Sequence, residues 1–258
     1  MDLSIIIVNY NSLAFLKNCI RSLLDIKDSL NKEIIVVDND SKDESIDFIK
    51  TNFPCVRLIE NKKNVGFAKA NNIGIKAAMG EYVLLLNPDT VVEQKNALEK
   101  MVDFARVNKN VGIIGPKLVY PDKSLQFSCR CFYNIRTIIL RRTFLGKLLS
   151  NSEVLKEHLM IEYSHNEIRE VDWVLAACLM ISRSVLEKIG YIDDKYRMYF
   201  EDVDLCYMTN KAGYKVYYFP ESVIIHHHQR ESAQGFSIKT IWHIQSAIRF
   251  FNKFGWRF

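Results

Sequence analysis

The sequence lacks the glycine-rich loops with which many nucleotide-binding folds hold phosphate groups. After its first apolar run, Leu3 to Val8, it continues with Asn9-Tyr10-Asn11-Ser12-Leu13, so no G-x-G-x-x-G loop follows that run. No G-x-x-x-x-G-K-[ST] loop occurs anywhere in the chain. A dinucleotide site or a P-loop is therefore excluded, and any phosphate has to be held in another way.

Cysteine is present, but not in a pattern that predicts a zinc site. The six cysteines are Cys19, Cys55, Cys129, Cys131, Cys178 and Cys206. None forms a C-x-x-C motif and most lie among apolar residues, so we expect reduced core residues of a cytosolic protein. Cys129 and Cys131 are the only close pair, and they lack the usual spacing of zinc ligands.

The sequence also has no apolar run long enough to cross a bilayer. The run from Leu3 to Val8 follows no basic segment and is too short for a leader peptide or a membrane span. No later segment reaches the roughly 18 uncharged apolar residues that a membrane helix needs. We therefore expect a protein that is soluble in the cytoplasm or attached peripherally.

Size and charge set further limits. The 258 residues are 48% hydrophobic, which suits one large α/β domain or one domain with an appendage. No internal repeat or low-complexity linker marks a boundary. The net charge of +5 suits a phosphate-bearing partner but is too small to indicate nucleic acid, and we expect none.

What the sequence does contain is an alternation of apolar runs and amphipathic segments. Five apolar residues, Tyr82 to Leu86, are too few for a helix and predict a strand buried on both faces. Pro88 cannot donate to a sheet ladder, so this strand should end before it. Further strands are expected at Leu3–Val8, Glu33–Asp38, Val56–Glu60 and Val111–Pro116. Helices between them predict an α/β fold with a doubly wound, mostly parallel sheet flanked by helices.

Polar residues follow three of these strands. They are Asn9, Tyr10 and Asn11, then Asp38 and Asn39, and finally Asn87 and Asp89. Because the carboxyl ends of parallel strands share one edge of a sheet, these side chains should converge into a ligand site. An aspartate after a proline is also common in turns, so Asp89 alone would not indicate such a site.

Asp89 is a candidate metal ligand. A carboxylate that faces a phosphate needs a bridging cation, because like charges repel at contact. Magnesium and manganese are hard cations that take carboxylate and phosphate oxygens. The triplet His226-His227-His228 follows a short strand and places His226 and His228 on one face, which favours at least one further ligand.

A second acidic segment begins an amphipathic helix at Glu201-Asp202 that should end at Gly213. Acidic residues in a first helical turn also suit the helix dipole, which is a structural explanation for them. Asp202, however, has the apolar neighbours Phe200 and Val203. A carboxylate partly desolvated there would be a competent general base.

Two basic segments are open to more than one interpretation. The segment from Arg130 to Lys147 alternates arginines with apolar residues, as in a helix on a membrane surface or a solvated helix packed on a core. The segment from Ile238 to Phe258 predicts a helix with aromatic residues and positive charge. It fits either a helix in an anionic membrane surface, which would place the protein peripherally on the inner face of the cytoplasmic membrane, or a helix packed on the sheet.

Over nearly its whole length the sequence resembles the family 2 inverting glycosyltransferases of GT-A fold, in their rhamnosyltransferase-like branch. The resemblance rests on six motifs in the family's order. They are Val8-Asn9-Tyr10-Asn11, Val37-Asp38-Asn39-Asp40-Ser41, Asn64-Val65-Gly66-Phe67-Ala68-Lys69-Ala70-Asn71-Asn72, Leu86-Asn87-Pro88-Asp89, Tyr199-Phe200-Glu201-Asp202-Val203-Asp204-Leu205-Cys206, and the histidine after Ile225.

The resemblance implies roles for individual residues. The nucleotide-sugar pocket would be formed by Val8, Tyr10, Asp38, Gly66, Asn71 and Asn87. Val8 and Tyr10 would pack on the pyrimidine, and Asp38 would bind its edge. Asp89 and His226 would bind the metal, with His228 as the alternative to His226. Asp202 would be the general base with Glu201 beside it, and the segment of Trp173 and Ala176 would contact the acceptor.

Two positions depart from the family pattern. Asn87 stands where the first aspartate of the D-x-D motif is expected, which removes one charge from the metal site. Ala176 replaces the usual glycine of the tryptophan-containing acceptor segment, which leaves the acceptor geometry undefined.

The function that the resemblance implies is metal-dependent, inverting transfer of a sugar from a dTDP- or UDP-linked donor, with dTDP-rhamnose preferred. The acceptor would be a hydroxyl of a glycan or lipid-linked molecule in cell-surface polysaccharide synthesis. We expect a catalytic domain over 1–237, with nucleotide-sugar-binding (1–117) and acceptor (118–237) halves, and an amphipathic helix at 238–258. The alternatives are a non-catalytic nucleotide-sugar-binding or scaffold module of the same fold, and a receiver-type phospho-acceptor domain. The chain is about twice as long as a receiver domain requires.

Overall fold

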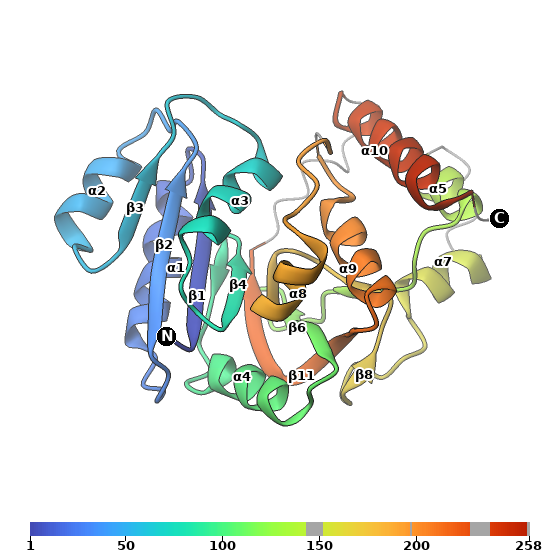
Figure 1. The fold of residues 1–258 in the computed structure, drawn as a ribbon, viewed down its shortest axis with the longest axis horizontal. Coiled ribbons are helices and arrows are strands. Elements are labelled where there is room, and N and C mark those ends of the chain that lie inside the picture. The colour runs from blue at the N-terminus through green and yellow to red at the C-terminus, as the bar shows by residue number, and fades with distance from the viewer. Residues whose placement is uncertain (143–151, 197, 228–237, 257–258) are drawn as a thin grey trace.

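The computed structural model describes residues 1–142, 152–196, 198–227 and 238–256. One mixed sheet runs through the molecule, in the strand order β3-β2-β1-β4-β10-β6-β11-β5, with β8 beside β11. Helices cover both faces of the sheet, and α10 lies at the opposite end of the molecule from α2 (Figure 1). The predicted α/β architecture and the C-terminal helix are confirmed.

The first half of the chain forms the parallel part of the sheet. Its strands are β1 (Leu3–Asn9), β2 (Lys32–Asp38), β3 (Arg57–Glu60) and β4 (Tyr82–Leu86). The helices between them are α1 (Leu13–Asp25), α2 (Ser45–Asn52) and α3 (Phe67–Ala77). In β1, β2 and β4 nearly every residue is buried, as expected for strands covered on both faces.

Close packing between α3 and β1 depends on Gly74. A Cβ atom at this position would lie 2.5 Å from Cγ2 of Ile6, so a larger residue would push the helix off the sheet. This contact keeps α3, and the loop that precedes it, against the carboxyl ends of β1 and β2.

The second half adds strands in both directions. They are β5 (Thr90–Val91), β6 (Val111–Val119), β7 (Cys129–Arg130), β8 (Arg169–Glu170), β9 (Trp173–Val174), β10 (Cys178–Ser182) and β11 (Lys215–His226). Strand β10 lies antiparallel between β4 and β6, and β11 is parallel to β6. Strands β7 and β9 pair separately as a small two-stranded sheet.

Six further helices complete the described structure. They are α4 (Ala97–Val107), α5 (Ile135–Arg142), α7 (Glu153–Leu159), α8 (Arg183–Ile189), α9 (Glu201–Lys211) and α10 (Ile238–Phe254). Figure 1 shows α10 running beside α5 and above α9. No helix in the described ranges is long and apolar enough to span a bilayer.

Several local features differ from what the sequence patterns indicate. The run from Val171 to Ile181 contains two strands, of which β10 is antiparallel to its neighbours, because a strand buried on both faces carries no sequence signal of direction. Strand β11 continues through Pro220, with an irregular register between Phe219 and Val223. Ser12 precedes α1 but donates to the Tyr10 carbonyl instead of capping the helix.

Two other local features are a tight turn and the free cysteines, of which the cysteines confirm a prediction. A hairpin turn lies at Tyr120–Ser124, where the Tyr120 and Ser124 backbones bond and Lys123 has a positive φ. All six cysteines are free, and four of them, Cys19, Cys129, Cys178 and Cys206, are buried.

Two basic residues of α10 contact acidic residues of the domain, which the sequence did not predict. Arg249 forms an ion pair with Asp193, and Lys253 contacts both Asp193 and Asp204. Ala247, Phe250 and Phe251 are buried against the domain. The helix is therefore attached by its aromatic and basic side chains, and these charges do not form an outward-facing basic surface.

Candidate active site

The carboxyl ends of β1 and β2 are joined by a buried polar network. The Asn9 side chain donates to the Asp38 carboxylate at 2.8 Å and to the Ser41 hydroxyl at 3.0 Å. The backbone N–H of Ser41 donates to the other Asp38 oxygen at 2.8 Å. Asp38 is fully buried, so in this structure its carboxylate organises the loop after β2. Its contact with a pyrimidine remains a prediction.

A second network holds the loop before α3. Asn39 donates to Asn64 at 2.8 Å and accepts from the backbone N–H of Val65 at 3.0 Å. Gly66 follows with φ of +88°, a conformation that favours glycine, and places the start of α3 next to these strand ends. The sequence-predicted residues of the first two strand ends and of this loop therefore form one continuous region.

Within this region the predicted nucleotide-contacting residues differ in exposure. Tyr10 is 48% exposed directly after β1, and Val8 is partly buried. Asn71 is buried in α3, where its side chain donates to the Phe67 carbonyl at 3.0 Å. Tyr10 is thus the side chain best placed to stack on a planar ligand.

Asp89 and His226 lie together at the next strand end. Their Oδ1 and Nε2 atoms are 3.4 Å apart, because β5 pairs with the end of β11. Gln126 donates through Nε2 to the His226 carbonyl at 2.6 Å, which leaves its Oε1 to accept from Nδ1 of the same histidine at 2.9 Å. This arrangement favours the tautomer with hydrogen on Nδ1 and directs the Nε2 lone pair toward Asp89.

The donor set at this position fits a hard divalent cation. A carboxylate oxygen and an imidazole nitrogen that face each other can both coordinate one ion. In the described ranges no three histidine, cysteine or acidic side chains come together as a metal cluster. A metal here would accordingly take its other ligands from water and from phosphate oxygens. His228, the alternative ligand, lies outside the described residues.

Asn87 links this end of the sheet to the acceptor segment. Its N–H donates to the Ala177 carbonyl at 2.9 Å, and its carbonyl accepts from the Thr90 hydroxyl at 2.7 Å. The backbone N–H of Ala176 donates to Asp202 at 3.3 Å. The metal-ligand candidates and the candidate base are therefore connected through two consecutive residues, Ala176 and Ala177, and the strand end beside them.

The pair Glu201-Asp202 begins α9 after two strained residues. Tyr199 and Phe200 have φ of 66° and 68°, in the left-handed region that larger residues rarely adopt. The ring of Phe200 is buried, which anchors this turn. Backbone N–H groups of Ala176 and Val203 donate to the two oxygens of Asp202 and fix its orientation.

Burial changes the acidity of both carboxyls. Burial, together with the charge of Asp202, raises the pKa of Glu201 to about 8. Burial also raises the pKa of Asp202, while the N–H donors of Ala176 and Val203 and the charge of Arg130 oppose that shift. The buried Oε2 of Glu201 has no hydrogen-bond partner among the described residues. The pair therefore has a raised affinity for protons, as a base that accepts a hydroxyl proton requires.

The middle of the chain supplies residues that the sequence analysis did not assign. Tyr133 stacks on Trp173 with ring centroids 5.6 Å apart and contacts Phe200 at 4.8 Å. Trp173 is itself buried and donates through its indole to the Cys131 carbonyl, and its contact with an acceptor stays a prediction. Gln126 and Tyr133 come from a segment with mixed apolar and basic residues, in which no spacing signals a site.

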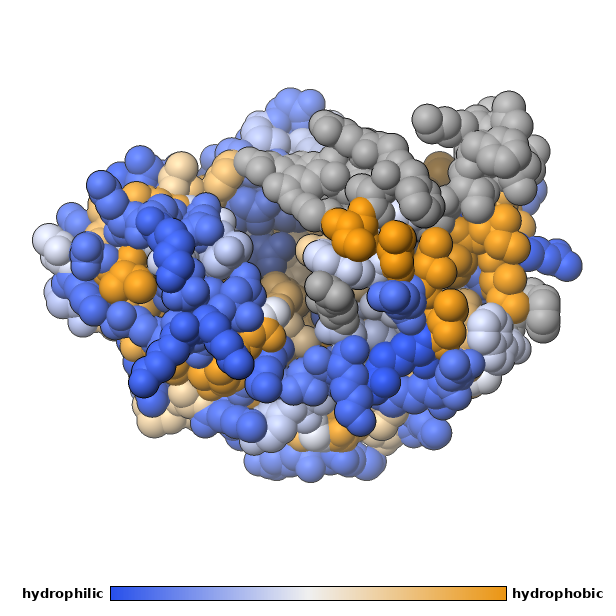
Figure 2. Space-filling view, turned by 90° about the horizontal axis from the view of Figure 1, so that it is seen from above, coloured by the Kyte–Doolittle hydropathy of each residue, from blue (hydrophilic) through white to orange (hydrophobic). Residues whose placement is uncertain are grey.

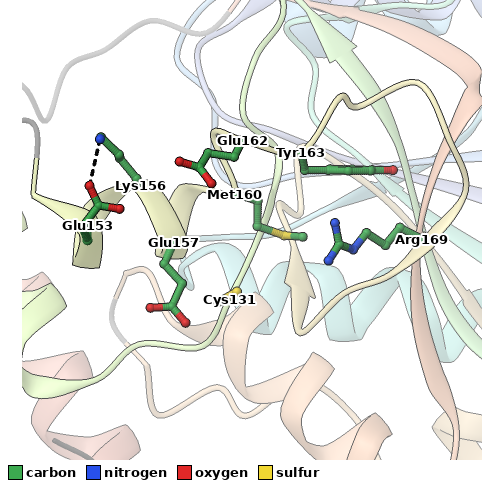
Figure 3. A pocket seen from close by; sticks show the side chains of 8 residues that line it. All are labelled: Cys131, Glu153, Lys156, Glu157, Met160, Glu162, Tyr163 and Arg169. Carbon is green, nitrogen blue, oxygen red and sulfur yellow. Dashed lines mark hydrogen bonds and ion pairs between the residues drawn. The ribbon is translucent and has the colours of Figure 1, made fainter.

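Two cavities in the described structure are not lined by any of the predicted site residues. One, of about 560 Å³, is lined by Cys131, Glu153, Lys156, Glu157, Met160, Glu162, Tyr163 and Arg169 (Figure 3). The other, of about 850 Å³, lies around Phe132, Asp172, Tyr207 and Tyr214. The candidate site is defined by the convergence of strand ends and not by an enclosed cavity.

Solved structures with the same fold define the class. The chain aligns over 97% of its length with a mannosyltransferase from Pyrobaculum calidifontis in complex with GDP-Man and Mn²⁺, at TM-score 0.65 and 17% identity, covering 63% of that chain. It aligns over 98% of its length with GalNAc-T7 solved with UDP, GalNAc and Mn²⁺, at TM-score 0.71 and 17% identity, covering 48% of that chain. The fold is the GT-A fold of nucleotide-sugar transferases.

Sequence comparison gives the family. The model of glycosyl transferase family 2 matches residues 4–190, and the chain belongs to this family. A hexosyltransferase of low-salt glycan biosynthesis, Agl10 of Haloferax volcanii, is 28% identical over 83% of this chain and 64% of its own length. The N-acetylglucosaminyl-diphospho-decaprenol L-rhamnosyltransferase of Mycobacterium tuberculosis is 28% identical over 75% of this chain and 66% of its own length. Rhamnosyltransferase WbbL of Escherichia coli is 28% identical over 72% of this chain and 69% of its own length.

These relatives confirm the resemblance to the rhamnosyltransferase-like branch. The chain spans about two thirds of the length of the curated relatives it matches. These comparisons therefore show a glycosyltransferase domain, and they do not identify its substrates.

Proposed function

We propose that the protein transfers a sugar, rhamnose by preference, from a dTDP- or UDP-linked donor to a hydroxyl of a glycan or lipid-linked acceptor. The observation that carries this proposal is Asp202, a partly buried carboxylate fixed by two backbone N–H groups and joined through Ala176 to the strand end that bears Asp89. The names of the relatives support rhamnose and polysaccharide synthesis at the cell surface. One relative is named for an acceptor that is a lipid-linked diphosphate.

The donor would lie across the ends of β1, β2 and β4. Tyr10 would stack on the pyrimidine, with Val8 and Asp38 beside it, while Gly66, Asn71 and Asn87 would line the rest of the pocket. Asp89 and His226 would hold a magnesium or manganese ion, which would neutralise the charge that develops on the departing diphosphate. Manganese is present in two structural neighbours.

Asp202 would act on the acceptor. As the acceptor oxygen attacks the anomeric carbon from the face opposite the nucleotide, Asp202 would take its proton. Inversion follows from a single in-line displacement with one base and no covalent intermediate. Glu201, with a pKa near 8, would hold a proton at neutral pH and limit the negative charge beside the base.

The direct test is a panel of nucleotide sugars with and without manganese. We expect dTDP-rhamnose to raise the melting temperature more than other donors do, and only when manganese is present, because a ligand that binds only the native state stabilises it. Slow release of dTDP from the same donor would show that the site is catalytic. Binding without any release would favour the non-catalytic module, and no shift with any donor would contradict the proposal.

We also propose that the domain covers residues 1–237, with its nucleotide-sugar and acceptor halves meeting near 117, and that α10 docks on a membrane. The exposed side of α10 carries isoleucines at 238, 241 and 248, which are 56%, 38% and 44% exposed. Ile139 of the neighbouring α5 is 43% exposed. Figure 2 shows hydrophobic residues gathered on this end of the molecule. The apolar side of the helix, and not its paired basic residues, would enter the lipid interface.

Liposome flotation tests this docking surface. Replacing Ile238, Ile241 and Ile248 with serine is expected to abolish flotation with anionic vesicles, because the apolar area that enters the interface is lost. Removing the whole helix would be a poor test, since Phe250 and Phe251 belong to the core. The matched control replaces Met79 and Val107, which are exposed elsewhere, with serine and should float normally. Equal flotation of both variants would contradict the proposal.

A further inference from the structure

Two arginines stack on a pair of aromatic rings, one of which, Tyr133, contacts Phe200 two residues before the candidate base, with ring centroids 4.8 Å apart. The guanidinium of Arg130 is 5.1 Å from the Trp173 ring, and that of Arg141 is 5.7 Å from the Tyr133 ring. The two rings stack on each other, so the guanidiniums share one platform. Arg141 also donates to the Tyr133 hydroxyl at 2.8 Å, which fixes its position.

Neither arginine forms an ion pair within the described part of the chain. Arg130 donates to the Phe127 carbonyl at 3.3 Å and to the Tyr133 side chain, and Arg141 contacts Nε2 of His158 at 3.1 Å. Arg249, in contrast, pairs with Asp193 at 2.8 Å. Burying part of a guanidinium group without a carboxylate partner costs free energy unless another anion pairs with it.

The electrostatics of this region show an excess of positive charge. Burial and the charge of Arg141 lower the pKa of Arg130 to about 10. Burial and both arginines lower the pKa of His158 to about 2, so this histidine is neutral. The charge of Arg130 also acts to lower the pKa of Asp202, against the effect of burial.

We propose that Arg130 and Arg141 form a subsite for a phosphate or diphosphate group carried by the acceptor. Guanidinium groups bind phosphate oxygens in pairs of parallel hydrogen bonds, and an aromatic platform restricts their side-chain freedom before the ligand binds. This inference rests on the proposed function. An acceptor sugar with a hydroxyl at Asp202 and a phosphate on its own anomeric carbon would place that phosphate beside the base, where Arg130 separates the two negative charges.

The other candidate places for this phosphate fit less well. The cavity next to Cys131 is lined by three glutamates against Lys156 and Arg169, and Lys156 is already paired with Glu153 (Figure 3). The donor diphosphate is expected at Asp89 and His226. Arg130 lies in β7, which pairs with β9, and the residues directly after β9 include Ala176, which donates to Asp202. The arginines therefore belong to the acceptor side.

Isothermal titration with farnesyl diphosphate and with farnesol tests the subsite. We expect the protein to bind the diphosphate and to bind farnesol far more weakly. Arg130→Gln with Arg141→Gln should weaken farnesyl diphosphate binding by roughly 100-fold or more, since each removes hydrogen bonds to a charged group. The Arg130→Lys, Arg141→Lys protein, which keeps the charges, should lose less. Arg169→Gln is the matched control, because Arg169 also stacks on an aromatic ring, Tyr163, but lies outside the subsite.

Titration of the same proteins with dTDP and manganese separates the donor from the acceptor. The Arg130 and Arg141 variants should bind dTDP as the unmodified protein does, which also shows that they are folded. The inference is wrong if dTDP binding falls with diphosphate binding, if farnesol binds as tightly as farnesyl diphosphate, if the protein binds neither, or if Arg169→Gln has the same effect. Failure of the nucleotide to bind in any of the proteins would instead contradict the proposed function.

Discussion

Replacing Asp202 with asparagine is expected to lower the rate of sugar transfer by roughly 100- to 10,000-fold while donor affinity stays close to that of the unmodified protein. Asparagine keeps the shape of the side chain but cannot accept the hydroxyl proton. The two N–H donors to Asp202 come from Ala176 and Val203, and neither belongs to the nucleotide-facing strand ends. Initial rates with dTDP-rhamnose and titration with dTDP and manganese measure the two quantities. Turnover above half of the unmodified rate would exclude Asp202 as the base.

Glu201→Gln is the matched control for this substitution. Because Glu201 keeps its proton below about pH 8, glutamine leaves the charge beside Asp202 unchanged at neutral pH, and activity there should persist. Stability gives an independent readout. Because the pKa of Glu201 is raised to about 8 in the folded protein, the native state holds a proton that the unfolded chain releases above its ordinary pKa, 4.5. Glu201 therefore costs stability as the pH rises from about 4.5 to about 8, and Glu201→Gln should raise the melting temperature at pH 8 but not at pH 4.

The strand ends were predictable because their signals are local. Apolar runs such as Tyr82–Leu86 define buried strands, and the alternation with helices implies that Asn9, Asp38 and Asp89 share an edge. The direction of β10 was not predictable in this way, because a strand buried on both faces looks the same in either direction. The antiparallel pairing of β10 with β4 brings Ala177 next to Asn87, and thereby the acceptor segment next to the metal-ligand candidates.

Long-range polar contacts were also beyond the sequence. Gln126 bonds to His226 across 100 positions, and nothing in the residues around Gln126 marks it as a support for a metal ligand. The contacts of the basic residues of α10 could not be predicted from the sequence either. Their charge suggested an outward-facing surface, but Arg249 and Lys253 find Asp193 and Asp204 on the domain. Charge patterns along a helix identify the residues that need a partner and leave open whether that partner is solvent, lipid or protein.

Asp89→Ala is expected to remove nearly all of the manganese-dependent part of dTDP binding, and His226→Ala to weaken it less. Asp89 supplies a formal negative charge to the cation, whereas His226 supplies a neutral nitrogen whose lone pair is directed by Gln126. Gln126→Ala should give a smaller loss, of about 10- to 100-fold in metal affinity, as is usual when the group that orients a ligand is removed. Titration with dTDP at fixed and at zero manganese separates metal-dependent from metal-independent binding.

The control for this series is Asp103→Ala, which removes a carboxylate that is 62% exposed on α4, away from the strand ends. It should leave both titrations unchanged, because a distant surface charge is screened by salt. Without manganese, the Asp89 and His226 variants should bind dTDP about as well as the unmodified protein, or slightly better, since a carboxylate next to the diphosphate repels it when no cation lies between them. Unchanged affinity of Asp89→Ala in the presence of manganese would show that the metal, if one is used, binds elsewhere.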